Sequence, residues 1–264
     1  MSGSSAKRLT VAAALPALLA FAFTVGQAGA EQSGRAGVEV SLDGSVSPRY
    51  LPRQRAVPVS LNLAGTIHAE HSPPPRLQTI EIAFGARGGL ETSGLSLCPR
   101  SRLRNATTRQ ALAGCRAALV GRGQISTEVA LGSEEPLLAR AGALAFNGRS
   151  GGRPTVWVHA YSAAPPVSFV IPFYLRRLGA GAYGMLLRAP VQEALGRWPR
   201  LRSFRITLGR RYSAGGEPRS YLSARCPLPP RFGIGLFPLA RATYHFAPGP
   251  TLSTTILRGC RVHR

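Results

Sequence analysis

The chain has 264 residues, of which 33 are basic and 11 acidic, so its formal net charge is +22 at pH 7. A chain of this length forms one large domain or two small ones that bury about 70% of the unfolded surface, which excludes a mini-protein dependent on disulfides or a metal. The positive charge, carried by arginine apart from Lys7, attracts polyanions, or else belongs to a solvated basic face that reflects a high-GC coding bias.

Residues 1–30 have the pattern of a secretory signal peptide: a cationic start, an apolar run from Leu9 to Val25, and the small residues Ala28-Gly29-Ala30. The alternative is an uncleaved anchor helix, because the run is nearly long enough to cross a hydrocarbon core of about 30 Å. Pro16 interrupts the run, which favours cleavage. We therefore predict a mature chain that begins near Glu31, has no membrane span, and is secreted or associated with the cell wall.

Three strands are predicted after this leader, because apolar and polar residues alternate at 38–42, 57–63 and 80–84. The spacing then becomes helical. It predicts one short helix near 105–120, which either Asn105 or Thr107 can cap.

Strand patterns resume after the helix and continue to the end of the chain. Many short strands with Gly/Pro turns and almost no long helix predict an all-β fold, mainly an antiparallel β-sandwich or jelly-roll-like arrangement. We expect a single domain over 31–264, with a minor boundary near 92–97 as the alternative. Pro172 belongs at an edge or bulge, because proline cannot donate to a ladder. The later strands are predicted at residues 125–131, 137–146, 155–161, 167–175, 204–212, 240–246 and 252–257.

Cys98, Cys115, Cys226 and Cys260 are the four cysteines. In an exported chain an even number predicts two disulfides, with three connectivities open. Local pairing closes the shortest loops, so we predict bonds from Cys98 to Cys115 and from Cys226 to Cys260, the first tethering the short helix. A zinc site needs closer Cys or His spacing, and we predict no metal.

The segment Gly148-Arg-Ser150-Gly-Gly152 matches the G-x-S-x-G motif of serine hydrolases, and Glu193 and His245 follow in the order of a catalytic triad. That chemistry needs the serine on a strand-to-helix elbow. Ser150 lies between two strand patterns, so a hairpin loop is the preferred interpretation. A secreted hydrolase that uses Ser150 or a pair of carboxylates remains the alternative function.

Two further patterns have structural interpretations. Residues Gly179 to Gly184 match G-x-G-x-x-G, but little room for a helix precedes Pro190, so we predict a turn and no dinucleotide or other cofactor. Trp157, His159 and Tyr161 share one strand face, where they form either a stacking platform or core. We favour core.

The densest basic cluster consists of Arg197, Arg200, Arg202 and Arg205, with Trp198 among them. Guanidinium groups hold phosphates or sulfates bidentately, while aromatic rings stack on sugars or bases. We predict this cluster as the ligand-binding site and an anionic wall polymer or polysaccharide as its partner. The alternative is a basic strand face without a ligand.

The segments Cys115 to Gly123, Ala145 to Gly148 and Ser220 to Pro227, followed by Cys260, resemble a group of uncharacterised exported proteins from high-GC bacteria. The similarity covers most of the mature chain. It implies a secreted β-rich fold and assigns no functional residues. We predict a secreted, non-catalytic cell-envelope or extracellular binding protein, and a purely structural surface protein is a further alternative.

Overall fold

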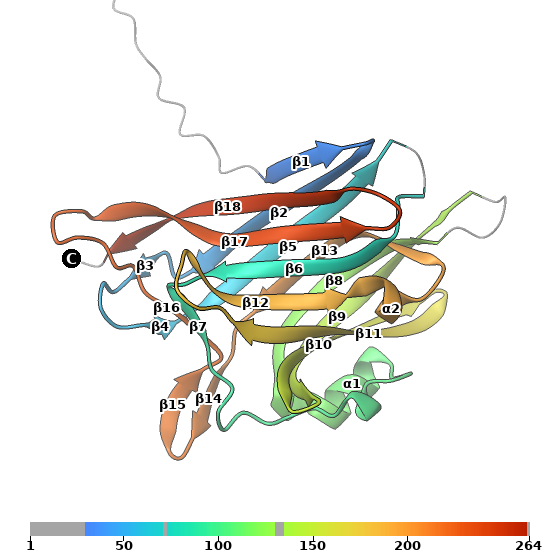
Figure 1. The fold of residues 1–264 in the computed structure, drawn as a ribbon. Coiled ribbons are helices and arrows are strands. Elements are labelled where there is room, and N and C mark those ends of the chain that lie inside the picture. Colours follow the sequence, from blue (N-terminus) through green and yellow to red (C-terminus); the bar gives the residue numbers. More distant parts are fainter. Residues whose placement is uncertain (1–29, 71–72, 130–134, 263–264) are drawn as a thin grey trace, which may run out of the picture.

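The structure is a computed structural model, and it describes residues 30–70, 73–129 and 135–262. The predicted signal peptide lies outside these residues. The first strand begins at Glu31, the residue at which the mature chain is expected to start. Among the described residues the fold is built almost entirely from strands (Figure 1).

The strands vary in length from two residues to fourteen. They are β1 (Glu31–Arg35), β2 (Val38–Ser47), β3 (Tyr50–Leu51), β4 (Val57–Pro58), β5 (Ser60–Ala69), β6 (Leu77–Gly85), β7 (Gly88–Leu90), β8 (Leu119–Val129), β9 (Leu137–Ser150), β10 (Arg153–Ala163), β11 (Pro166–Arg177), β12 (Tyr183–Pro190), β13 (Pro199–Leu208), β14 (Arg211–Ala214), β15 (Glu217–Ser220), β16 (Leu222–Ala224), β17 (Ile234–Phe246) and β18 (Thr251–Val262).

Most of these strands form one 13-stranded sheet, in the order β1-β2-β5-β13-β8-β9-β10-β11-β12-β6-β17-β18-β3. Every ladder in it is antiparallel except the short pairing of β3 with β18. The sheet curls, so that β17 and β18 pack against β2 (Figure 1). The predicted all-β, mainly antiparallel fold with one short helix is therefore confirmed. A three-stranded sheet, β4-β16-β7, and the β14–β15 hairpin complete it.

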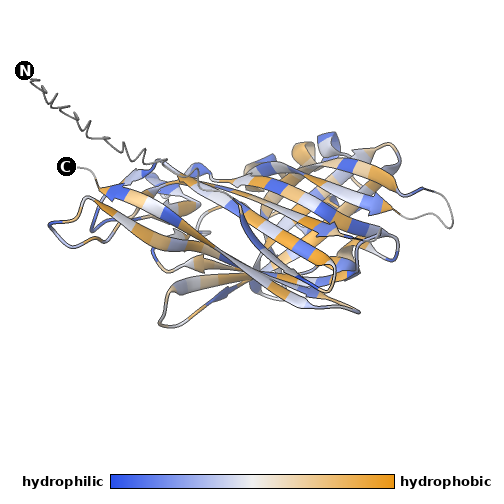
Figure 2. Cartoon of the chain, turned by 90° about the horizontal axis from the view of Figure 1, so that it is seen from above, coloured by the Kyte–Doolittle hydropathy of each residue, from blue (hydrophilic) through white to orange (hydrophobic). Residues whose placement is uncertain are grey.

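The interior of the curled sheet is the main hydrophobic core. Alternate residues of β2, among them Val40 and Leu42, are fully buried, as the period of two predicts. They pack in one cluster with Ile82, Val156 and Ile256 from strands across the sheet. Alternation is visible along many strands in Figure 2. Burial of this apolar interior is the main force that holds the curled sheet together.

The predicted helix is α1 (Thr108–Cys115), and it covers the outer face of β9 and β10. Thr107 rather than Asn105 caps it. The Thr107 hydroxyl accepts from the Gln110 N–H at 3.3 Å, and the Gln110 side chain accepts from the Thr107 N–H at 2.8 Å, a reciprocal capping box. A second hydrophobic cluster, with Trp157 and Phe146 at its centre, lies beneath the helix.

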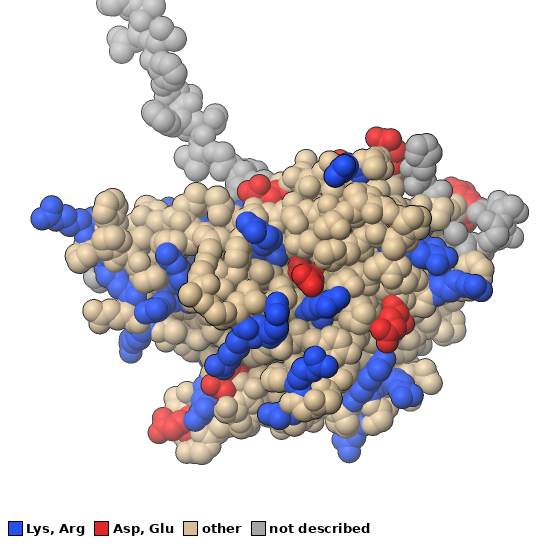
Figure 3. Space-filling model, viewed as in Figure 1, with Lys and Arg blue, Asp and Glu red and all other residues tan. Residues whose placement is uncertain are grey.

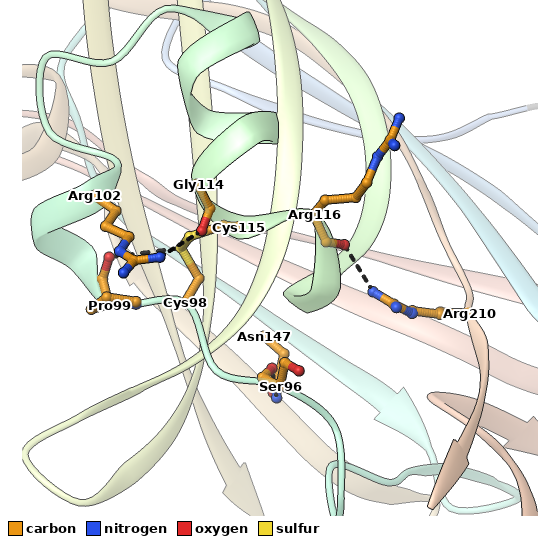
Figure 4. The surroundings of a disulfide bond; sticks show 9 residues. All are labelled: Ser96, Cys98, Pro99, Arg102, Gly114, Cys115, Arg116, Asn147 and Arg210. Atoms are coloured by element: carbon orange, nitrogen blue, oxygen red, sulfur yellow. Dashed lines mark hydrogen bonds between the residues drawn. A yellow bond between two sulfur atoms is a disulfide. The ribbon is translucent and has the colours of Figure 1, made fainter.

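The Cys98–Cys115 disulfide ties the end of α1 to the segment that precedes the helix (Figure 4). Arg102 donates to the Gly114 carbonyl at 2.9 Å beside it. The Cys98 N–H donates to the Asn147 carbonyl at 2.9 Å, and the buried Asn147 side chain donates to the Ser96 carbonyl at 3.1 Å. The predicted tether of the helix is confirmed, and its anchor on the sheet is β9.

The Cys226–Cys260 disulfide joins the loop before β17 to the end of β18. Both bonds are the local pairings that loop length favoured. They indicate that the chain folds in an oxidising, extracytoplasmic environment. None of the helices within the described ranges is long and apolar enough to span a membrane.

Polar side chains join the two parts of the sheet where β17 and β18 cross β2. Arg258 forms an ion pair with Asp43 at 2.5 Å and donates from Nε to the Gly44 carbonyl at 2.7 Å. The Tyr244 hydroxyl donates to the Ser41 carbonyl at 3.2 Å. Asp43 is the only aspartate in the chain, and this contact gives it a structural role. We call the set of contacts the seam.

Replacing Arg258 by alanine is expected to lower the free energy of unfolding by about 1–2 kcal/mol, because two charge-assisted contacts across the seam are lost. Urea unfolding measures the change. Arg188→Ala is the matched control: Arg188 pairs with Glu81 at 3.4 Å on the neighbouring strand and its side chain is 63% exposed, so its loss is expected to cost less than about 0.5 kcal/mol. Equal effects of the two substitutions would contradict a special role for the seam.

Candidate functional site

The predicted arginine cluster lies on β13 and just before it. Two of its arginines form contacts within the protein, and two are exposed. Arg200 is half-buried and donates to the carbonyls of Arg197 and Trp198 at 2.8 and 3.0 Å. Burial, and after it the charge of the nearby Arg76, lowers the pKa of Arg200. Arg202 forms an ion pair with the buried Glu128 at 3.5 Å. Two of the four predicted arginines thus already have internal partners.

The other members of the cluster are open to solvent. Arg205 and Arg197 are exposed, and the Arg197 guanidinium lies 6.0 Å from the ring of Trp198, which is 56% exposed. This arginine and tryptophan remain available to an external ligand. Anion binding by the cluster stays a prediction.

The residues of the alternative hydrolase are not brought together. Ser150 pairs with Arg153 at the end of the β9–β10 hairpin, and no helix follows it. His245 lies on β17, where it pairs with Thr79 of β6, and β17 is five strands away from β9 in the sheet. Glu193 lies on α2 (Val191–Leu195). The serine therefore has neither the elbow nor the neighbouring base that a triad requires.

The two further patterns have the predicted structures. Trp157 and His159 are buried core residues: the ring Nε2 of His159 lies 2.8 Å from the Ala106 carbonyl oxygen, and burial lowers the pKa of this imidazole. The glycine-rich segment of residues 179–184 begins in the connection between β11 and β12, and its last two residues belong to β12, so it leads into a strand instead of a helix.

The described residues enclose a cavity of about 780 Å³, which we call the large cavity. It lies at the end of the molecule that carries β3, β4, β7 and β16, on the left in Figure 1. Its volume is that of a pocket for a small organic ligand. Most of its wall is apolar. The side chains come from the inner face of the 13-stranded sheet and from the three-stranded sheet β4-β16-β7, which we call the small sheet. These include Leu61, Phe84, Leu187, Leu208 and Leu222.

The apolar wall continues into the core. A smaller cavity of about 70 Å³ lies deeper between the two parts of the curled sheet, and its lining is apolar. Phe84, Leu187 and Leu208 line both cavities. These apolar side chains therefore form a wall that the two cavities share.

The charged residues around the large cavity are predominantly basic. Five arginines line it, against one acidic residue, Asp43, which is already paired with Arg258. A wall of low polarity strengthens the field of charges at its rim. The cavity is therefore set to attract an anion. The five arginines are Arg49, Arg87, Arg225, Arg258 and Arg261.

Arg87 differs from the other four arginines in its surroundings. Its guanidinium carbon lies 3.3 Å from the centroid of the Phe237 ring, and its Nη1 is buried with no hydrogen-bond partner among the described residues. Burial, and after it the like charge of Arg225, lowers the pKa of Arg87. An arginine remains protonated at neutral pH all the same. A buried donor without an acceptor is costly, and the face of the Phe237 ring offsets part of that cost.

The neighbouring arginines have partial partners. Arg225 donates to the Gln54 carbonyl at 3.4 Å. Arg261 donates to the Tyr50 hydroxyl at 3.2 Å, and Arg258 belongs to the seam. Arg87 and Arg225, two like charges close together, are therefore the strongest candidates for direct contact with an anion.

The pairing of short strands explains why Arg87 lies at the large cavity. Gly85 ends β6, and Gly88, Gly89 and Leu90 form β7, which pairs with β16. The Arg225 N–H donates to the Arg87 carbonyl at 3.2 Å, so the small sheet holds both arginines at the mouth. Sequence analysis missed them because they come from segments far apart in the chain, and neither has a spacing signal.

Comparison with known proteins gives no further guide: no protein-family model, no curated protein and no solved structure matches the chain.

Proposed function

We propose that this chain is an exported, non-catalytic binding protein whose large cavity holds an amphipathic anion. The observation that carries the proposal is the lining of a mostly apolar cavity of about 780 Å³, in which five arginines face one aspartate. The leader pattern of residues 1–30 and the two disulfides support export.

The chemistry of the cavity favours a ligand with two unlike ends. A carboxylate, phosphate or sulfate accepts hydrogen bonds from a guanidinium in a bidentate geometry, which Arg87 and Arg225 can provide. An apolar chain or ring gains about 25 cal/mol per Å² when it leaves water for the leucine-rich wall. A purely polar anion would leave that wall without a partner.

Binding of dodecanoate, measured by calorimetry, tests the anion site. Arg87→Gln is expected to weaken binding by about tenfold or more, because a charge-assisted hydrogen bond contributes about 1.5–3 kcal/mol. Arg122→Gln, an exposed arginine on β8 that does not line the cavity, is the control and should leave the affinity unchanged. Equal affinities of the two variants would contradict the assignment of Arg87.

Two related compounds test the two ends of the ligand separately. Dodecanol lacks the charge and acetate lacks the chain, so both are expected to bind more weakly than dodecanoate. Acetate that binds as tightly as dodecanoate would remove the apolar wall from the proposal.

A second candidate ligand is an anionic wall polymer or polysaccharide on the exposed pair Arg197 and Trp198, which a tryptophan at 56% exposure favours. Two single substitutions distinguish the candidate binding sites. Retention on a teichoic-acid matrix that is lost in Arg197→Ala and kept in Arg87→Gln assigns polymer binding to the cluster on β13. Retention that is lost in Arg87→Gln and kept in Arg197→Ala assigns binding of the anionic groups to the cavity.

A further inference from the structure

Large apolar side chains are exposed at the end of the molecule where β17 begins and β18 ends, on the left in Figure 1. Ile234, Leu236 and Leu257 are 61%, 65% and 42% exposed, and Phe232, just before β17, is 60% exposed. The β17–β18 register places Ile234 and Leu236 on the same face as Leu257. We call these four residues, together with Arg231 and Arg261, the tip surface.

The loop that leads into this surface is held in place. Arg53 donates to the carbonyls of Leu228, Pro230 and Phe232 at 2.8, 3.0 and 3.0 Å. The Val262 N–H donates to the Gly233 carbonyl at 2.9 Å, and the Cys226–Cys260 disulfide fixes the start of the loop to β18. The apolar side chains are thus presented by an anchored loop.

The charge around the tip surface is predominantly positive, although Asp43 pairs with Arg258 beside it. The segments 47–58, 225–239 and 256–262, which meet at this end, contain seven arginines and no aspartate or glutamate. Figure 3 shows basic and no acidic side chains at the left end of the face in view. In Figure 2, hydrophobic and hydrophilic stretches lie side by side near the C label. The seven are Arg49, Arg53, Arg55, Arg225, Arg231, Arg258 and Arg261.

We infer that the tip surface docks on an anionic lipid surface. Apolar side chains bordered by guanidinium groups match the boundary between acyl chains and phosphate headgroups. Single exposed apolar residues are ordinary, whereas a contiguous patch marks an interaction site. A second copy of this chain is a poor occupant, because its tip would bring a second predominantly basic surface against the first. An anionic membrane supplies both the apolar layer and the opposite charge.

Docking in this way places the cavity beside the lipid. Ile234 and Arg261 belong to the tip surface and also line the large cavity. The docked protein would therefore present the cavity mouth where amphipathic anions are dissolved. The inference goes beyond the proposed function, because the tip surface can dock whether the cavity is filled or empty.

Vesicle flotation tests the inference with purified protein that begins at Ala30. We expect the protein to float with phosphatidylcholine vesicles that contain phosphatidylglycerol, and to remain unbound with phosphatidylcholine alone. High salt should weaken binding, because exposed charges are screened. Equal binding to both kinds of vesicle would overturn the inference.

The double variant Leu236→Ser/Leu257→Ser, at two exposed tip residues that do not line the cavity, is expected to bind anionic vesicles at least about tenfold more weakly, because the apolar anchor is removed. The matched control is Leu137→Ser/Leu138→Ser: these leucines are 45% and 51% exposed on β9, away from the tip surface, and their loss should leave flotation unchanged. Undiminished flotation of the tip variant would overturn the inference, as would tip-dependent dimerisation that replaces vesicle binding.

Binding of soluble dodecanoate separates this inference from the proposed function. A tip variant that binds dodecanoate normally and no longer floats is folded, and this result supports docking. A tip variant that binds dodecanoate and floats like the unmodified protein overturns docking and leaves the cavity proposal intact.

Discussion

Replacing Trp157 by alanine is expected to lower the free energy of unfolding by about 3–5 kcal/mol. The side chain is 2% exposed and is among the largest fully buried side chains of the described fold. It packs with Phe146 and Leu103 between β10 and the helical segment. Truncation removes the apolar burial of the indole and leaves a cavity beneath α1, which the Cys98–Cys115 tether prevents from collapsing fully.

Urea unfolding followed by far-ultraviolet circular dichroism measures this effect. The matched control is Trp198→Ala, because the other tryptophan of the chain is 56% exposed and its loss should cost less than about 0.5 kcal/mol. Similar losses in the two variants would show that the cluster under the helix does not stabilise the fold as its burial indicates.

The sequence predicts the strands well where one face is core and the other is open. Val40 and Leu42 alternate with polar neighbours, and that period alone locates β2. In β10 the pattern is ambiguous because both faces are covered, one by the main core and the other by the cluster under α1. His159 and Trp157 are buried for that reason. The preference for core over a stacking platform is confirmed for these two residues, whereas Tyr161 is only half-buried.

Local chemistry predicts the exceptions to the pattern. Pro172 lies in the part of β11 that β12 does not pair, since the β11–β12 ladder covers only Tyr174 to Arg177. It therefore has an open edge on one side, as predicted. The strand predicted at 204–212 is instead divided between β13 and β14 at Gly209, whose φ of +152° breaks the ladder where it meets Ser60.

The large cavity could not be predicted from the sequence. Part of its wall is formed by β3, β7 and β16, strands of only two or three residues, which are too short to show any period. Arg87 and Arg225 meet there through sheet pairing between segments well over a hundred residues apart. The cluster of arginines between 197 and 205 was visible because its members are close in sequence. Closeness in the sequence therefore does not predict which arginines line a cavity.

Removing the Cys226–Cys260 disulfide by a double Cys→Ser substitution is expected to lower the free energy of unfolding by about 4 kcal/mol. The bond closes a loop with a sequence separation of 34, and constraint of the unfolded chain increases with loop length. The same change at Cys98 and Cys115, with a separation of 17, is expected to cost about 3 kcal/mol. Thermal and urea unfolding of both variants measure the difference.

The two disulfide variants should differ more in binding than in stability. Cys260 lines the large cavity, and its bond fixes the loop that carries Phe232, so the variant lacking Cys226–Cys260 should lose both dodecanoate binding and flotation under conditions where it is still folded. The variant lacking Cys98–Cys115 loses a tether on the opposite face of the sheet and should keep both. If loss of the Cys226–Cys260 bond left both kinds of binding intact, then neither the cavity mouth nor the tip surface would depend on the anchored loop, and the arrangement that links them would be wrong.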